Sequence, residues 1–174
     1  APLQKTFHQE RTLLFGTDSK VVVPDHSDLT LSENPSGDDL PFTIAFWMKP
    51  TDASESSYLF GKYGSEYYCR RTNRRLEMRF YDVSAGGKFL KFESSSQMLP
   101  DQDNVWQHVA IVHESNVIKF YLNGSLAETV TGTQVTAGYE DMDDGAHDFC
   151  IGALRAALNG DSFVGELSNF IIFK

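Results

Sequence analysis

The sequence predicts an all-β fold, a sandwich of two antiparallel sheets, and three observations carry this prediction. Short apolar or alternating runs recur along the chain with turn residues between them. No window keeps the i, i+3, i+4, i+7 spacing of an amphipathic helix. The clearest turn is Asn123-Gly124, which supplies the two positive-φ residues of a tight hairpin. The 174 residues are sufficient for one domain with its own core, over residues 1–174.

The expected strands follow one another at short intervals. Along the chain they cover residues 13–15, 20–23, 28–31, 42–49, 57–63, 66–71, 75–81, 88–93, 106–114, 117–122, 125–130, 148–154 and 164–173. So many short strands predict two packed sheets rather than one. Large apolar side chains are expected to fill the layer between the sheets: Phe46, Trp47, Trp106, Phe120, Phe163, Phe170 and Phe173. His108 lies in the middle of a strand and is expected to be a core or sheet-face histidine rather than a catalyst.

Charge and composition argue against some classes of function. Asp and Glu (24) outnumber Lys and Arg (15), which gives a net charge of −9 at pH 7, whereas nucleic-acid binding needs a basic surface. No apolar run reaches the roughly 18–20 residues that span a bilayer, so membrane insertion is not expected. Cys69 and Cys150 have no zinc-site spacing, and both a single disulfide and two buried thiols fit their strand-like surroundings. Asn123-Gly124-Ser125 is also an acceptor signal for glycosylation.

Several segments occur in an order that is typical of one known superfamily. They are LLFGTDSKVVVPDHSDLTL (13–31), FTIAFWMKP (42–50), YLFGKYG (58–64), WQHVAIVHESNVIKFYLNGSL (106–126) and SFVGELSNFIIF (162–173). Together they resemble the laminin-G-like and pentraxin-like jelly rolls of the concanavalin A-like lectin/glucanase superfamily. The resemblance implies a concanavalin A-like jelly roll. It also implies an extracellular or cell-surface location, as part of a longer protein.

The same superfamily contains lectins, adhesion modules and glycosidases, so the fold alone does not give the function. Its glycosidases commonly present two carboxylates from one strand as Glu-x-Asp-x-Glu, and that motif is absent here. We therefore expect a non-catalytic extracellular recognition module that binds carbohydrate. A protein-binding adhesion or spacer domain is the alternative, and a glycoside-cleaving enzyme is less favoured.

A basic and aromatic stretch is the predicted ligand surface. Arginine forks bind carboxylates or sulfates in pairs, and tyrosine faces stack on sugar rings. The stretch would form a hairpin that turns at Thr72-Asn73-Arg74, with Arg71 and Arg70 on opposite faces. The alternative is a solvated hairpin whose cations pair with neighbouring acids. The predicted ligand residues are Lys62, Tyr63, Tyr68, Arg70, Arg79 and Tyr81.

Calcium is the one cofactor that the sequence suggests, because acidic loops supply the oxygen ligands that it needs. In laminin-G-like domains an ion often joins the turn after the first strand to the last strand. The matching positions are Gly16, Asp18, Ser168 and Asn169, although the family commonly has two acids at the last two. A second candidate is the acidic loop with Asp141, Asp143 and Asp144. For both regions the alternative is a solvated acidic turn. Residues 151–158 contain no acid, which argues against pentraxin-style bridging by paired calcium ions.

Overall fold

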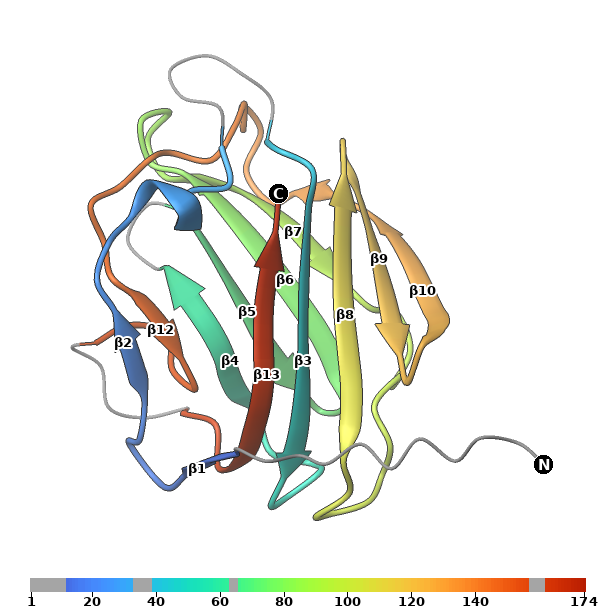
Figure 1. Ribbon diagram of the computed structural model, residues 1–174. Helices are drawn as coiled ribbons and strands as arrows, with labels where there is room; N and C mark the ends of the chain where they lie inside the picture. The colour runs from blue at the N-terminus through green and yellow to red at the C-terminus, as the bar shows by residue number, and fades with distance from the viewer. Residues whose placement is uncertain (1–11, 33–38, 63–65, 157–161) are drawn as a thin grey trace.

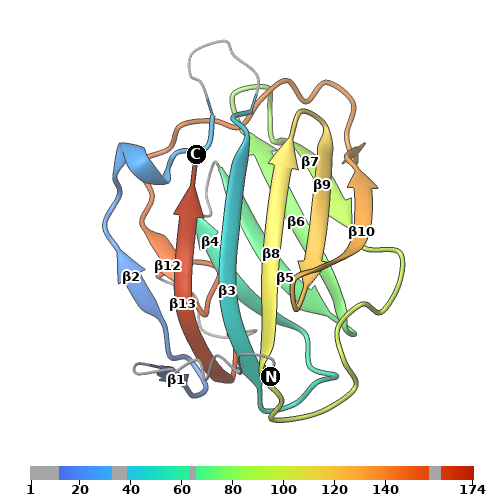
Figure 2. The same ribbon diagram turned by 45° about the vertical axis from the view of Figure 1, so that its right-hand side comes forward.

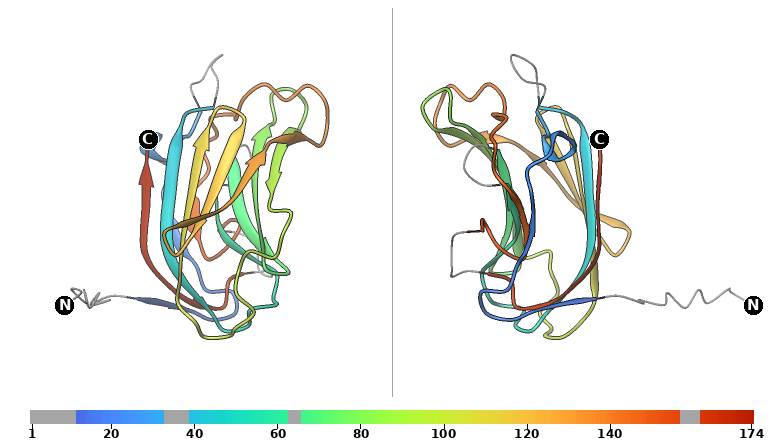
Figure 3. Two further views of the ribbon diagram at one scale, coloured as in Figure 1. Left: turned by 90° about the vertical axis from the view of Figure 1, so that its right-hand side faces the viewer. Right: turned by 60° about the vertical axis from the view of Figure 1, so that its left-hand side comes forward.

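The fold is a sandwich of two antiparallel sheets, as predicted (Figures 1 and 3). The computed structural model describes residues 12–32, 39–62, 66–156 and 162–174. The six-stranded sheet contains, in spatial order, β1 (Leu13–Phe15), β13 (Gly165–Phe173), β3 (Phe42–Pro50), β8 (Gln107–Glu114), β9 (Val117–Leu122) and β10 (Ser125–Thr131). The seven-stranded sheet contains β11 (Thr133–Gln134), β7 (Lys88–Glu93), β6 (Arg75–Asp82), β5 (Tyr67–Thr72), β4 (Ser57–Lys62), β12 (Phe149–Ile151) and β2 (Val21–Val23).

Sequential hairpins join β8, β9 and β10 in one sheet and β4, β5, β6 and β7 in the other, while the remaining neighbours are distant in the chain; Figure 2 shows β8, β9 and β10 as neighbours in one layer. The β9–β10 hairpin turns at Asn123 (φ 50°) and Gly124 (φ 81°), which confirms the tight turn expected there. The Asn123 side chain accepts a hydrogen bond from the His108 backbone N–H at 2.9 Å. The β5–β6 hairpin turns at Asn73 (φ 49°) and Arg74 (φ 63°), also as predicted.

Two strand predictions need correction, and one short strand was not predicted. The sequence predicts a strand over 28–31, but Ser27–Leu29 form a 3-10 helix, in which the His26 side chain accepts a hydrogen bond from the Asp28 N–H at 3.2 Å. This local capping interaction favours a turn over an extended chain. The strand predicted over 148–154 is limited to Phe149–Ile151, because Gly152 takes a φ of 82° and ends it. Thr133–Gln134 form a short strand that pairs with β7. No alternating apolar pattern in the sequence indicated this strand.

Strand alternation decides which aromatic residues enter the core. Along β3 every second residue is buried, so Phe46 points between the sheets and Trp47 points outward. Trp47 instead contacts His108, its partner across the strands, with ring centroids 5.2 Å apart. Trp106 is also only half-buried, beside Lys49, and Phe173 is 58% exposed. The core prediction was therefore wrong for these three residues and right for Phe46, Phe120 and Phe163, while Phe170 packs against the core.

Cys69 and Cys150 are both buried free thiols, so the disulfide alternative is wrong. Burial raises the pKa of the Cys69 thiol well above its ordinary value. Among the described residues, no helix is both long and apolar enough to cross a membrane.

Candidate functional site: a face of tyrosines and arginines

The outer surface of the seven-stranded sheet carries a cluster of aromatic and charged side chains from four adjacent strands. Residues directly opposite each other in neighbouring strands share a face of the sheet. The register pairs Tyr58 of β4 with Arg70 of β5, and Arg70 in turn with Glu77 of β6. The same face continues through further pairs as far as β7. We call this surface the tyrosine-arginine face; it consists of Tyr58, Tyr68, Arg70, Arg75, Glu77, Arg79, Tyr81, Phe89, Lys91 and Glu93.

Glu77 is the centre of the tyrosine-arginine face. Its side chain is only 4% exposed, yet it binds two guanidinium groups. Arg70 donates from one terminal nitrogen to Oε2 of Glu77 at 3.0 Å, and the Nε atoms of Arg70 and Arg79 lie 3.0 Å and 2.6 Å from Oε1 in ion pairs. The Tyr68 hydroxyl donates to the same carboxylate at 3.2 Å. One buried acid therefore fixes the position of two arginines and a tyrosine.

Aromatic rings support the arginines from below and beside. The Arg79 guanidinium lies 4.9 Å from the ring centre of Phe89 and 5.7 Å from that of Tyr68, both within the range of cation–π attraction. Tyr68 is 3% exposed, so it forms the floor of the face rather than a contact surface. Burial raises the pKa of Tyr68 far above its ordinary value, and the neighbouring Tyr81 and Glu77 raise it further. Tyr68 therefore remains a neutral hydrogen-bond donor.

The tyrosine-arginine face is positive within an acidic protein. Its four cations (Arg70, Arg75, Arg79 and Lys91) and two carboxylates (Glu77 and Glu93) give 4 − 2 = +2, against −9 for the chain. Burial is the largest single effect and lowers the pKa of the Arg70 guanidinium, but the hydrogen bond and the charge of Glu77, with smaller contributions from Tyr68 and Tyr58, together raise the pKa overall. The Arg70 and Arg79 side chains are still 31% and 22% exposed, so both cations reach solvent.

Comparison with known proteins agrees with this architecture. The family model Laminin_G_3, described as concanavalin A-like lectin/glucanases superfamily, matches residues 15–174. The chain belongs to this family. No curated protein sequence matches it. The resemblance inferred from the sequence motifs is thereby confirmed.

Solved structures show the same fold at low sequence identity. The binding domain of Paraclostridial Mosquitocidal Protein 1 superposes with a TM-score of 0.64 at 17% identity, over 93% of this chain and 39% of that one. A protein of Bacteroides ovatus that is proposed to bind carbohydrate gives 0.61 at 15% identity, over 90% and 42%. The ligand-binding domain of botulinum neurotoxin serotype D, in complex with N-acetylneuraminic acid, gives 0.57 at 18% identity, over 95% and 41%. This laminin-G-like domain thus spans about two fifths of each of these chains.

The structure brings four of the six predicted ligand residues of this laminin-G-like domain together. Tyr68, Arg70, Arg79 and Tyr81 all lie on the tyrosine-arginine face. Tyr63 lies outside the described residues. Lys62 requires correction, because its side chain is completely buried and cannot contact a ligand at the surface.

Lys62 instead belongs to a buried ionic cluster. Its ammonium group binds the Glu66 carboxylate, lies 2.8 Å from Asp25 and donates to the Gly145 carbonyl at 3.0 Å. Burial disfavours the charge on Lys62, but the hydrogen bonds to Asp25 and Glu66 outweigh it and raise the lysine pKa. For Glu66 burial dominates over the lysine and raises the pKa to about 7. Lys62 therefore fastens two loops to the end of β4, which is a structural role.

The sequence prediction missed the residues that organise the face, which are Glu77, Tyr58, Phe89, Lys91 and Glu93. For the residues of β6 and β7 the signal was alternation: in RLEMRFY (75–81) the residues Arg75, Glu77, Arg79 and Tyr81 share one face, and in KFLKFE (88–93) the residues Phe89, Lys91 and Glu93 do. The predicted hairpin turn at 72–74 accounts for Arg70 opposite Glu77. What the sequence pattern does not contain is the pairing of β7 with β6, which places Lys91 opposite Arg79 and Glu93 opposite Glu77.

The two predicted calcium regions of this laminin-G-like domain have separate geometries. β1 pairs with β13 from Phe15 opposite Gly165 to Leu13 opposite Leu167, so Gly16 follows one end of this ladder. Asn169 lies beyond its other end, about four residues or roughly 13 Å along β13 from Gly165. The register therefore places Gly16 and Asn169 near opposite ends of this ladder, and an ion shared by Gly16, Asp18, Ser168 and Asn169 stays a prediction.

In the acidic loop the carboxylates bind different neighbours. Asp143 accepts hydrogen bonds from the backbone N–H groups of Val83 and Ser84, and Asp144 accepts one from the Thr30 hydroxyl at 3.1 Å. Asp143 is therefore held at the β6–β7 turn, and Asp144 is held beside Thr30. Asp141 is the third acid of the predicted set. Within the described ranges no three His, Cys, Asp or Glu side chains are grouped as a metal site would need.

Proposed function

We propose that this domain is a non-catalytic recognition module that binds carbohydrate at the tyrosine-arginine face, with a preference for sugars that carry a carboxylate or sulfate. The observation that supports it is the array around Glu77, in which partly exposed arginines stand beside half-buried Tyr58 and Tyr81. Fixed arginines and aromatic rings are the groups that recognise acidic sugars elsewhere.

The arginines keep donors for a ligand after binding Glu77. A guanidinium carries five N–H groups, and Arg70 uses one terminal N–H for its hydrogen bond to the carboxylate. Because Glu77 fixes the guanidinium, little side-chain entropy is lost when a ligand carboxylate binds. The ring of Tyr81, which packs between Tyr68 and Phe89, offers a surface against which a sugar ring can stack.

The positive charge of the tyrosine-arginine face matters because the protein as a whole is acidic. A chain of net charge −9 repels an acidic sugar at long range. Screening limits that repulsion to about 8 Å at physiological ionic strength, so capture depends on local charge. A strip of net charge +2 supplies this local attraction.

The comparisons support the same class of ligand without assigning it to a surface. One structural neighbour is in complex with N-acetylneuraminic acid, an acidic sugar, and another is proposed to bind carbohydrate. A non-catalytic role fits Glu77, which two arginines and a tyrosine hydroxyl occupy, so it is not placed to act as a general acid. We also propose an extracellular location, as part of a longer protein.

The test is calorimetric titration with 3′-sialyllactose as the acidic probe and lactose as its neutral counterpart. We expect sialyllactose to bind, to bind more weakly as salt is added, and to lose about tenfold in affinity in Arg70→Ala and in Arg79→Ala. Lys119→Ala removes one cation from the six-stranded sheet and should leave binding unchanged. If neither added salt nor either arginine substitution weakens binding, the binding site lies elsewhere on the sandwich.

Calcium dependence is a separate part of the proposal. The same titrations with calcium chloride and with EDTA measure it directly, and thermal melting in both solutions tests for a bound ion by mass action. A higher midpoint in calcium that Asp143→Ala abolishes would assign the ion to the acidic loop. Equal midpoints and equal affinities would remove calcium from the proposal.

A further inference from the structure

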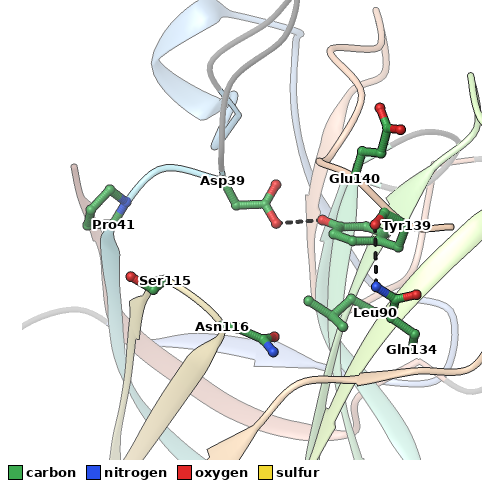
Figure 4. Close-up of a pocket in the computed structure, with 8 residues that line it drawn as sticks. All are labelled: Asp39, Pro41, Leu90, Ser115, Asn116, Gln134, Tyr139 and Glu140. Atoms are coloured by element: carbon green, nitrogen blue, oxygen red, sulfur yellow. Dashed lines mark hydrogen bonds between the residues drawn. The ribbon is translucent and has the colours of Figure 1, made fainter. Parts of the chain in front are cut away.

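A cavity of about 470 Å³ lies at one end of the sandwich, away from the tyrosine-arginine face. Both sheets contribute to it: Ser115 and Asn116 from the β8–β9 turn, Leu90 from β7 and Gln134 from β11 (Figure 4). Leu90 stands between Phe89 and Lys91 in the strand, so it points to the opposite side from them. The cavity and the face therefore lie on the two sides of the same strand.

The cavity has a fixed aromatic wall. Tyr139 is 8% exposed, and its hydroxyl donates to Asp39 at 2.5 Å. Asp39 in turn accepts a hydrogen bond from the Met142 N–H at 2.7 Å. Burial raises the pKa of Tyr139 far above its ordinary value, and Asp39 raises it further, so the hydroxyl stays protonated. The ring is thereby held in one orientation before any ligand arrives.

Two amides add directional donors and acceptors. The Gln134 side chain is positioned at both ends, since its oxygen accepts from the Gly138 N–H at 3.1 Å and its nitrogen donates to the Tyr139 carbonyl at 3.4 Å. Each amide nitrogen and oxygen can make a second hydrogen bond. Asn116 is exposed and lines the same cavity from the opposite sheet, with the Ser115 hydroxyl beside it. Figure 4 shows both amides on the side of the cavity below Tyr139.

The charge of the cavity is opposite to that of the tyrosine-arginine face. Among the described residues, its lining contains the carboxylates of Asp39 and Glu140 and no lysine, arginine or histidine. Figure 4 shows the Glu140 carboxylate turned away from Asp39, so the two acids do not face each other across a substrate as a glycosidase pair does. An acidic sugar would be repelled here, whereas hydroxyl groups match amides and carboxylates.

We propose that this end cavity is a second binding site, selective for a neutral, hydroxyl-rich ligand of about one sugar ring. The volume lies within the roughly 300–1,000 Å³ of small-molecule sites. The Tyr139 ring and Leu90 contact the apolar face of the sugar, and Gln134, Asn116 and Ser115 bind its hydroxyls. This inference does not rest on the proposed function, because the two sites share no residue and select opposite charge.

Residue-resolved NMR of the full ¹⁵N-labelled chain tests the proposal. The probes are D-glucose, D-galactose, D-mannose and N-acetyl-D-glucosamine, with N-acetylneuraminic acid and spermidine as charged probes. At least one neutral sugar should shift the backbone signals of Ser115, Asn116, Gln134 and Glu140, and neither charged probe should. Signals of Arg70 and Tyr81 report the other face separately, so failure at one site is distinguishable from failure at the other.

Variants then test the amides. Gln134→Ala and Asn116→Ala should each raise the dissociation constant of the neutral sugar about tenfold, because each removes hydrogen bonds to hydroxyls. Gln102→Ala, an exposed glutamine in another loop, is the matched control and should bind as the wild type does. If Asn116→Ala fails to fold, Gln134→Ala carries the test alone. The proposal is overturned if no neutral sugar shifts these signals, if spermidine shifts them instead, or if Gln134→Ala binds unchanged.

Discussion

Arg70 and Arg71 are neighbours in one strand, yet they lie on opposite sides of it and have different roles. Arg71 is 1% exposed and donates to the Ser57 hydroxyl at 3.0 Å and to the carbonyls of Ala53 and Asp52. Its guanidinium lies 5.8 Å from the Phe163 ring centre. Arg70 is 31% exposed and binds Glu77 on the outer face.

The difference shows what a buried cation requires. Removing a guanidinium from water is costly, so Arg71 is tolerated inside only because fixed acceptors surround it. Burial lowers the pKa of Arg71, and the nearby Glu55 and Asp52 only partly oppose this effect. The outer arginine keeps access to solvent and remains able to meet a ligand. We therefore expect inner cations to govern stability and outer cations to govern binding.

The largest expected effect is that of Arg71→Ala, which should lower the free energy of unfolding by about 3–5 kcal/mol. The substitution leaves two carbonyls and a hydroxyl without their buried donor and opens a cavity beside Phe163. Arg70→Ala should cost at most about 1 kcal/mol, because its ion pair is partly solvated. Urea denaturation of both variants measures the comparison.

Arg71→Met serves as the control for volume, since it keeps much of the side chain and removes the donors. Arg71→Met should recover the part of the stability loss that comes from the cavity. The part that comes from the lost hydrogen bonds should remain. Equal stability of Arg71→Ala and Arg70→Ala would contradict the separation of inner and outer roles.

The same comparison applies to Phe46 and Trp47 in β3. Phe46→Ala removes a ring that is 1% exposed and should cost about 3–5 kcal/mol. Trp47→Ala removes a larger but half-buried ring on the outer face and should cost less, about 1–2 kcal/mol. Thermal melts rank the two, and a larger loss for Trp47→Ala would mean that the outer surface of the six-stranded sheet is covered.

These pairs also show how far the sequence could predict the structure. Alternation correctly separated Arg70 from Arg71, because only one side of a half-buried strand tolerates an exposed cation. It was ambiguous in FTIAFWMK, where both sides of β3 carry apolar residues, and there the prediction put Phe46 and Trp47 together in the core. The large side chain of Trp47 favoured a place in the core, but its position in β3 puts it on the outer face.

For the site, the sequence contained the residue types but not their neighbours. It indicated Tyr68, Arg70, Arg79 and Tyr81 because they are close in the chain. It could not distinguish Lys62, which lies in the same segment and is fixed inside by Asp25 from the distant β2 side of the sheet. The end cavity was beyond sequence reasoning altogether, because its walls come from segments as far apart as Asp39 and Tyr139.

The buried ionic cluster predicts an unusual pH dependence. Because the pKa of Glu66 is raised from 4.5 to about 7 by burial, the folded state binds more protons than the unfolded state between these values. Stability from this group should therefore be complete below about pH 4.5 and fall as pH rises through 7, by about 3 kcal/mol at most. Lys62 and Asp144 are the charged groups that act on Glu66, and Asp25 is the second partner of the same lysine.

Glu66→Gln measures that contribution, because it keeps the shape and removes the titrating proton. The melting midpoints of wild type and Glu66→Gln should be most similar at pH 5. As the pH rises to 8, the midpoint of the wild type should fall relative to that of the variant. A wild type that gains stability relative to Glu66→Gln on going to pH 8 would show that the lysine, not burial, controls the carboxyl group.

The most informative substitution for the outer face is Glu77→Gln, and its expected effect on stability is small. It should cost about 1–2 kcal/mol, because hydrogen bonds to a charged acceptor become hydrogen bonds to a neutral one. The variant makes the tyrosine-arginine face more positive by one charge while loosening Arg70 and Arg79. These two consequences act oppositely on binding of 3′-sialyllactose. We expect affinity to fall about threefold, with a steeper salt dependence, because a fixed fork binds a carboxylate better than a mobile one does. Affinity that rises in Glu77→Gln would mean that the face attracts ligands through net charge alone, and that the fixed geometry around Glu77 serves only the sheet.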